Sequence, residues 1–236
     1  MTILEGLQHA LSLILRFDPE LTGIVFLSLT VSVLALAIAS AIGLPLGAFL
    51  GLTRFRGRGA VISIMNTFMG LPPVVVGLFL YLLLSRSGPM GFLGLLYTPS
   101  AMVIAQTILA FPIVVSLTSS AVLAVDPVIR QAALSLGASR VQASAAVVRE
   151  ARYGILSAII AAFGRVMAEV GAILIVGGNI AGLTRVMTTA IALETDKGNF
   201  ELALALGIVL LLISLAVNML LHLIQKRNPG HSELWA

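Results

Sequence analysis

Cysteine is absent from this chain of 236 residues, and histidine occurs only three times, at positions 9, 222 and 231. Without cysteine there are no disulfides, no thiolate metal ligands and no thiol nucleophile. Three histidines this far apart are too few for a haem-bearing or histidine-rich metal bundle. We therefore expect no metal site in this chain and no cysteine-dependent chemistry.

Charged residues are also scarce, at 10% of the chain against about 25% in an average soluble domain. Hydrophobic residues make up 59%, and the mean hydropathy is +1.09. A water-soluble globule of this composition would have too few polar side chains to cover its surface. Long unbroken apolar runs also differ from the alternating segments, each of about ten residues, that build an outer-membrane barrel. The composition predicts an all-α membrane protein with several spans.

Five apolar stretches can each cross a bilayer as a helix, which takes about 20 residues. They are residues 23–52, 60–84, 100–125, 153–178 and 202–224. A shorter piece, residues 3–17, contains Glu5 and is expected to lie at the membrane interface. The chain then divides into an outer segment 1–22, a transmembrane domain 23–225 and a tail 226–236. Gly43, Gly47 and Gly51, spaced by four, predict a close helix–helix contact in the first span.

Arginine and lysine indicate the orientation, because cytoplasmic loops carry an excess of both. With the N-terminus outside, nine of the fourteen lie on the inner side, four lie outside, and Arg165 falls within a span. We expect an outer N-terminus, a cytoplasmic C-terminus and a long cytoplasmic loop at residues 126–152. This distribution also accounts for the net charge of +4, so no nucleic-acid partner is predicted.

The long inner loop has the pattern of a helix. Asp126 and Pro127 form a typical helix start, with a side-chain cap followed by proline at the first position. Small and apolar residues then recur every three to five positions, at Ala132, Ala133, Leu136, Val141 and Ala145. We expect one short amphipathic helix parallel to the membrane. Such a helix either rests among lipid headgroups or presents a face to a cytosolic partner, and the pattern alone favours neither.

Within this loop, Gln131-Ala132-Ala133 is followed after three residues by Gly137 and after nine more by Val147. The pattern resembles the signature of the permeases of type I ABC importers, which reads Glu-Ala-Ala, three residues, Gly, nine residues, Ile, one residue, Leu-Pro. Gln131 replaces the glutamate, and Arg149-Glu150 stand where Leu-Pro is usual. The resemblance implies a coupling helix between spans three and four that docks on an ATP-hydrolysing subunit. The residues implied in this docking are Gln131, Ala132, Ala133, Gly137 and Arg140.

Several further motifs resemble the tungstate-type permeases of this family. They are Phe163-Gly164-Arg165, Glu169-Val170-Gly171, Gly177-Gly178-Asn179-Ile180, Thr184-Arg185, Thr188-Thr189-Ala190 and the departure Arg149-Glu150-Ala151-Arg152. Molybdate and sulfate permeases share parts of this pattern, including Leu71-Pro72-Pro73-Val74. The resemblance implies import of an oxyanion, with tungstate first and molybdate the nearest alternative.

The same resemblance implies a set of partners. They are a second copy of the chain, with the anion passing along the two-fold axis, two ATP-binding subunits in the cytosol, and an external binding protein that delivers the anion. ATP and Mg would be bound by the ATPase subunits, and this chain would bind no cofactor. The implied location, within membrane lipid, is the inner membrane of a bacterial or archaeal cell.

Two charged residues are expected inside the fourth span. Arg165 and Glu169 are four apart, so on one continuous helix they face the same side. Charges at membrane depth are costly and usually face the protein interior or an aqueous cavity. One interpretation is a neutralised pair that fixes helix packing, and the other is a pair that lines or gates the anion route.

Two other groups are route or gate candidates. Asn66, Pro72 and Pro73 mark a break or kink in the second span, because proline lacks an amide donor and clashes with the preceding turn. That break either lines a cavity or is a packing kink. Near the outer end of the fourth span lie Gly177, Gly178, Asn179, Thr188 and Thr189. Their amides and hydroxyls either bond a passing oxyanion or simply end a helix and turn the chain.

Two other functional classes fit these residues less well than an importer subunit does. An intramembrane protease needs a serine–histidine pair or two aspartates within the membrane. No histidine lies near a mid-membrane serine, and Asp18, Asp126 and Asp196 fall at span ends or in loops. We therefore expect no catalytic residue and no enzyme. An ion-coupled carrier usually has internal repeats and intramembrane carboxylates, whereas this chain has no visible repeat and only Glu169.

Overall fold

The computed structural model describes residues 3–226, and the regular elements in that range are all helical. In chain order they are α1 (Ile3–Leu15), α2 (Pro19–Leu52), α3 (Arg58–Phe68), α4 (Pro73–Leu84), the 3-10 turn η1 (Gly91–Leu93), α5 (Pro99–Leu123), α6 (Pro127–Ser135), α7 (Arg140–Glu150), α8 (Arg152–Met167), α9 (Gly171–Gly177), α10 (Met187–Asp196) and α11 (Phe200–Lys226). The expected all-α fold is therefore confirmed.

By length and composition, three of these helices can each cross a membrane alone: α2, α5 and α11 over Phe200–Met219. Two further spans are bent pairs. The axes of α3 and α4 differ by 96°, and those of α8 and α9 differ by 57°. If each bent pair counts as one span, there are five, at the positions that the apolar stretches predict. Apart from Lys226, the expected tail 226–236 lies outside the described residues.

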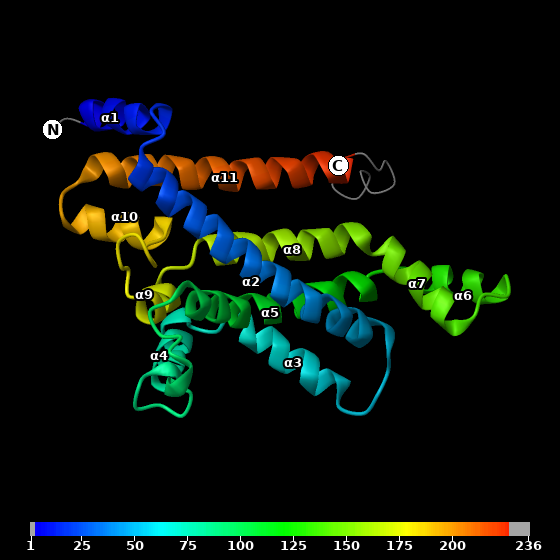
Figure 1. The fold of residues 1–236 in the computed structure, drawn as a ribbon. Helices are drawn as coiled ribbons and strands as arrows, with labels where there is room; N and C mark the ends of the chain where they lie inside the picture. Colours follow the sequence, from blue (N-terminus) through cyan, green and yellow to red (C-terminus); the bar gives the residue numbers. More distant parts are fainter. Residues whose placement is uncertain (1–2, 227–236) are drawn as a thin grey trace.

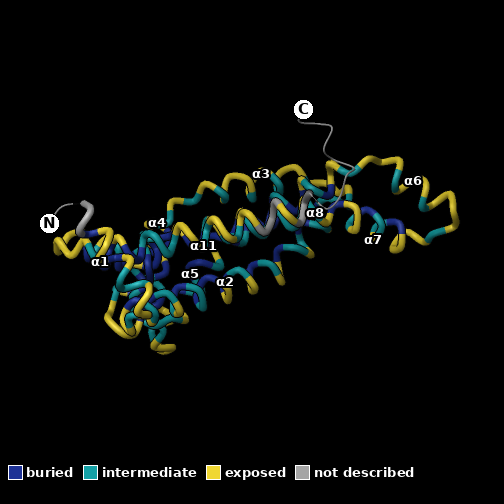
Figure 2. The backbone as a smooth tube through the Cα atoms, turned by 90° about the horizontal axis from the view of Figure 1, so that it is seen from above, coloured by how far each residue is buried: buried dark blue, intermediate teal, exposed yellow. Residues whose placement is uncertain are grey.

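The long helices run side by side along an elongated molecule (Figure 1). Helices α6 and α7 project at one end, while α1, α4 and α10 lie at the other. The loop between α2 and α3, the start of α8 and the end of α11 share the α6–α7 end. This end therefore gathers seven arginines, at positions 54, 56, 58, 130, 140, 149 and 152. Figure 2 shows that α3 and α6 are mostly exposed, and neither has a buried residue.

The loop at residues 126–152 differs from the expected single helix. It forms two helices, α6 and α7, that pack against each other. Asp126 caps α6 as predicted, since its side chain accepts the Val128 amide at 2.8 Å. Gly137 ends α6 instead of lying within one helix: its φ is +87°, a left-handed conformation that favours glycine. The Ala138 amide then bonds the Ala133 carbonyl at 3.0 Å, which closes a Schellman turn.

Helices α2 and α5 share the most extensive helix–helix contact in the described structure. A stripe of small residues four apart on α2 faces α5 and comprises Ala35, Ala39, Gly43, Gly47 and Gly51. A Cβ atom built on Gly47 would lie 2.7 Å from the backbone oxygen of Val115 on α5. No side chain fits there, so the two backbones are in contact, as the glycine spacing predicts.

This contact yields a test with a matched control on the same helix. Gly47→Ala should destabilise the fold by about 1–3 kcal/mol, the usual cost of overpacking, because its Cβ meets backbone. Gly23→Ala should leave stability unchanged or raise it slightly, because nothing lies within 4 Å of that Cβ and alanine favours helix. Thermal unfolding in detergent measures both. Equal midpoints for the two variants would contradict the close contact.

Candidate functional site

The second span breaks where proline makes a continuous helix impossible. Pro72 has an extended backbone with ψ of 120°, and Pro73 is the first residue of α4. Helical backbone is disfavoured before proline, and proline itself cannot donate to the preceding turn. The amides of Val75 and Val76 bond the Pro72 carbonyl at 3.0 and 3.2 Å, which leaves the Leu71 carbonyl without a helical partner. The expected break at Pro72-Pro73 is therefore real. Asn66, the third candidate there, lies exposed on α3.

The fourth span also breaks, which sequence analysis did not predict. Helix α8 ends at Met167 and α9 begins at Gly171. Glu169 lies between them, 4% exposed, and its Oε1 accepts the Ala172 amide at 3.0 Å. A carboxylate in this position satisfies a free amide of the new helix and favours its positive end. Arg165 and Glu169 are therefore not on one continuous helix, and the expected shared helix face is wrong.

One of the two interpretations of these residues, a neutralised pair, is not found in the described structure. Its ion pairs at 3–226 involve Arg185, Lys197, Glu20 and Glu194, and none includes Arg165. Instead, Nη2 of the partly buried Arg165 donates to the Leu71 carbonyl at 3.5 Å. Arg165 at the end of α8 thus bonds the carbonyl that the proline break leaves free.

The two breaks adjoin because the half-helices that follow them pack together. A Cβ on Gly77 of α4 would lie 2.9 Å from the Ala172 Cα of α9. A Cβ on Gly171 would lie 2.8 Å from the Val74 Cγ2. Glycine at both positions lets α4 and α9 approach to backbone distance. The broken ends of two spans, with Arg165 between them, therefore form one structural unit.

The candidate residues after α9 mainly stabilise the turn and the loop that lead to α10. Gly178 and Asn179 have φ of +71° and +50°, so they end α9 and turn the chain. The Asn179 Nδ2 donates to the Thr189 carbonyl at 3.3 Å, and the Gly177 carbonyl accepts the Thr184 hydroxyl at 2.6 Å.

Both hydroxyls that were candidates for a passing oxyanion are already bonded. The Thr188 hydroxyl donates to the Glu169 carbonyl at 2.7 Å. The buried Thr189 hydroxyl bonds the amide and carbonyl of Val186. This geometry favours the turn-forming interpretation of the segment.

A charged cluster holds α10 at the end opposite α6 and α7. Glu194 is buried, and its carboxylate bonds Lys197 at 2.8 Å and Asn199 at 2.9 Å. Arg185 lies 3.9 Å from Glu194 and 3.4 Å from Glu20 at the start of α2. The Lys197 hydrogen bond lowers the pKa of Glu194 against the opposing effect of burial. The cluster therefore ties the segment after α9 to the first span.

The α6–α7 hairpin presents the residues implied in partner docking. Gln131, Ala132, Gly137 and Arg140 are exposed, and Ala133 is partly buried. Arg140 is the first residue of α7, so the docking residues lie on two helices and the turn between them. Large apolar side chains are also exposed here, namely Leu136 at 88%, Val141 at 79% and Val128 at 62%.

Three polar residues near the second break were not identified from sequence. Gln106 on α5 and Ser28 and Ser32 on α2 are each 5% exposed or less. Two of them form hydrogen bonds to other elements. Gln106 Nε2 donates to the Val166 carbonyl at 3.2 Å, and Ser28 Oγ accepts the Met187 amide at 2.8 Å. The available signal was a polar side chain inside an apolar span, which usually faces the protein interior.

Comparison with known proteins places this architecture among transport components. The model of the family described as "binding-protein-dependent transport system inner membrane component" matches residues 43–228. A probable anion ABC transporter permease protein of Haloferax volcanii is 48% identical, covering 90% of this chain and 94% of its own. The tungstate uptake system permease protein of Peptoclostridium acidaminophilum is 42% identical, covering 95% and 98%.

More distant similarities extend the comparison. The molybdenum transport system permease protein of Escherichia coli is 31% identical, covering 90% of this chain and 98% of its own. Among solved structures, a bacterial ABC transporter involved in import of the polysaccharide alginate superposes with a TM-score of 0.72 at 20% identity. That match covers 94% of this chain and 84% of the other, and at this identity it bears on the fold alone.

Proposed function

Since the chain belongs to the family of binding-protein-dependent transport system inner membrane components, we propose that it is the permease of an ATP-driven oxyanion importer. Membership makes it a transport subunit of the inner membrane and not an enzyme. One observation carries the proposed anion route: two bent spans meet at α4 and α9, with an arginine between them that has no ion-pair partner among residues 3–226. Broken helices at membrane depth are tolerated where they line a cavity or are covered by protein.

Tungstate is the proposed substrate, with molybdate second. Support comes from the identity to the tungstate permease, 42%, against 31% for the molybdenum permease. Both anions are tetrahedral dianions of nearly equal size, so a route that passes one has little means of rejecting the other. We therefore assign the choice between them to the external binding protein that delivers the anion.

The route requires a second copy of this chain. Five spans enclose a path for a multi-atom anion poorly, and α4 leaves Val74, Val75, Leu78, Phe79 and Leu82 exposed. Helix α3 has no buried residue at all. A second copy that covers α3 and α4 would bring both pairs of bends to the two-fold axis. Asn66, Pro72, Pro73, Arg165 and Glu169 then lie beside the route, and Gly177–Asn179, Thr188 and Thr189 shape its outer mouth.

The energy for transport comes from two ATPase subunits, which bind ATP and Mg, while this chain binds no cofactor. We place them on the α6–α7 hairpin at the arginine-rich end, because cytoplasmic loops carry the excess of arginine and lysine. The C-terminus is then cytoplasmic and the N-terminus outside. ATP binding closes the ATPase pair, draws the two hairpins together and opens the route outward, and hydrolysis returns it inward.

The function is tested by uptake of labelled tungstate into proteoliposomes that hold this chain and its ATPase, with binding protein outside. Uptake should require ATP and all three proteins. Excess molybdate that fails to suppress uptake supports tungstate, and suppression by molybdate indicates a broader oxyanion importer. Uptake without the ATPase, driven by an ion gradient, would overturn the importer assignment in favour of a secondary carrier.

The docking role is tested at Leu136, because substitution of Gly137 would strain its left-handed backbone. Leu136→Asp places a charge in the apolar contact and should abolish both ATP-driven uptake and co-purification of the ATPase. Leu136→Met keeps an apolar side chain and should retain both. The side chain is 88% exposed, so neither change disturbs the permease itself. Full uptake by Leu136→Asp would contradict the proposal that the ATPase binds the α6–α7 hairpin.

The anion role of Arg165 is tested by its charge. Arg165→Leu should slow tungstate uptake by about tenfold or more, equal to about 1.4 kcal/mol of lost stabilisation, because a dianion then passes the bends without a countercharge. Arg165→Lys should keep most of the rate. Both variants should assemble with the ATPase and retain its basal ATP hydrolysis. Equal uptake by the leucine and lysine variants would leave Arg165 only a packing role.

A further inference from the structure

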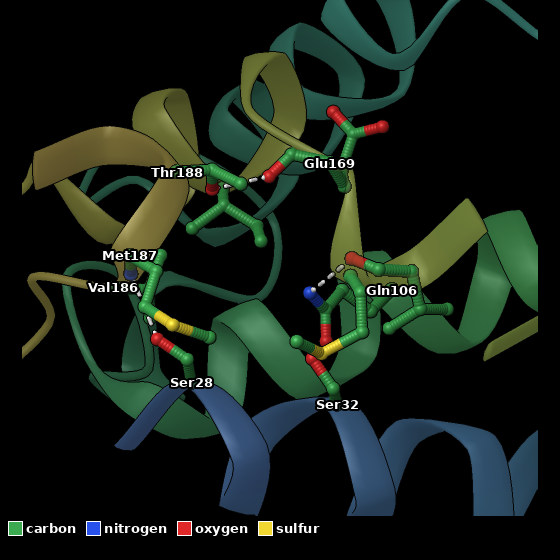
Figure 3. Close-up of a pocket in the computed structure, with 10 residues that line it drawn as sticks. Ser28, Ser32, Gln106, Glu169, Val186, Met187 and Thr188 are labelled. Carbon is green, nitrogen blue, oxygen red and sulfur yellow. Dashed lines mark hydrogen bonds between the residues drawn. The ribbon is translucent and has the colours of Figure 1, made fainter. Parts of the chain in front are cut away.

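A small cavity lies at the break between α8 and α9, lined by polar and apolar residues of α2, α5, the end of α8, α9 and the start of α10 (Figure 3). Its volume is about 10 Å³, close to the minimum that one water molecule needs. Its polar lining residues are Ser28, Ser32, Gln106, Glu169 and Thr188.

The hydrogen bonds around the cavity leave one acceptor unused. Gln106 is 2% exposed, and its Nε2 donates to the Val166 carbonyl at 3.2 Å. That bond fixes the orientation of the amide, because the reverse orientation would set its oxygen against a carbonyl oxygen. Gln106 Oε1 is consequently buried with no hydrogen-bond partner in the described structure. Leaving a buried acceptor unsatisfied is energetically costly, so such atoms nearly always have a partner.

Ser32 of α2 supplies a second polar group in the cavity lining. Its side chain is 3% exposed, and no residue of the described chain bonds its hydroxyl. Figure 3 shows the Ser32 side chain pointing from α2 toward the Gln106 amide, while the Glu169 carboxylate points away from both. Ser28 already donates to the Ile24 carbonyl and accepts the Met187 amide. The cavity therefore presents one acceptor and one free hydroxyl.

We propose that this cavity binds one ordered water molecule, which donates to Gln106 Oε1 and bonds the Ser32 hydroxyl. A buried water usually makes about three hydrogen bonds. The water bridges α2 and α5 beside the end of α8, whose Val166 and Met167 also line the cavity, at the bend that contains no proline. It thus satisfies the polar groups that hold this bend.

Two methionines that line the cavity allow a direct test, because hydroxyl radicals formed from a bound water oxidise nearby thioethers to sulfoxides. Met167 and Met187 line the cavity and are 5% and 1% exposed. Met102 is 0% exposed and packs against Gly177, outside the cavity lining. The full chain in lipid nanodiscs would be irradiated with X-ray pulses in the presence of a bulk radical scavenger. Peptide mass spectrometry should show Met167 and Met187 oxidised several-fold faster than Met102.

Variants assign the signal to the bound water. Gln106→Leu and Ser32→Ala each remove one partner and should reduce oxidation of Met167 and Met187 to the rate of Met102. Ser40→Ala removes another unpartnered buried hydroxyl of the same helix, outside the cavity lining, and should leave the pattern unchanged. If Gln106→Leu does not fold, the oxidation pattern of Ser32→Ala tests the proposal alone. Equal oxidation of all three methionines in the folded wild-type protein, or an unchanged pattern in the folded cavity variants, would overturn the proposal.

Discussion

A helix that is interrupted inside a bilayer must find hydrogen-bond partners within the protein, because lipid offers none. This constraint accounts for the polar residues of the two bent spans. At the proline break, the Leu71 carbonyl is bonded by Arg165. At the second break, the Glu169 carboxylate accepts the Ala172 amide in the first turn of α9, and Gln106 donates to the Val166 carbonyl in the last turn of α8. Arg165, next to the second break, therefore stabilises the proline break.

The shared support for both breaks is α5. Its contact with the small-residue stripe of α2 is at backbone distance, so α5 has little freedom to shift. One apolar cluster joins Met102 and Ala105 of α5 to Val76 and Leu80 of α4 and to Ile173 of α9. Both half-helices after the breaks are thus seated on the same rigid helix. Their directions are fixed by packing against α5 and against each other, and not by the break residues alone.

Sequence analysis predicted the features whose cause is local. Five apolar stretches of sufficient length, the cap at Asp126 and the proline break each follow from residues close together in the chain. The second break was not predictable in this way, because the bond to Glu169 and the contact of Gly171 with Val74 form only in the folded protein. The division of residues 126–152 into two helices could have been predicted in part from sequence, since Ser139 and Gln142 form a capping box that starts a new helix.

Helix α8 directly connects the α6–α7 hairpin to the break between α8 and α9. Ala151, which is 5% exposed, is both the C-cap of α7 and the N-cap of α8. It packs with Val122 of α5 and Val147 of α7. From there α8 runs for 16 residues, about 24 Å at 1.5 Å per residue, to the break beyond Arg165. A helix resists axial compression because its backbone hydrogen bonds run roughly parallel to its axis and join each turn to the next. In the proposed importer, a shift of the hairpin by the ATPase would therefore reach Arg165, and through the Leu71 carbonyl it would reach the proline break. The proposed docking element and the bends would then need no connection other than α8.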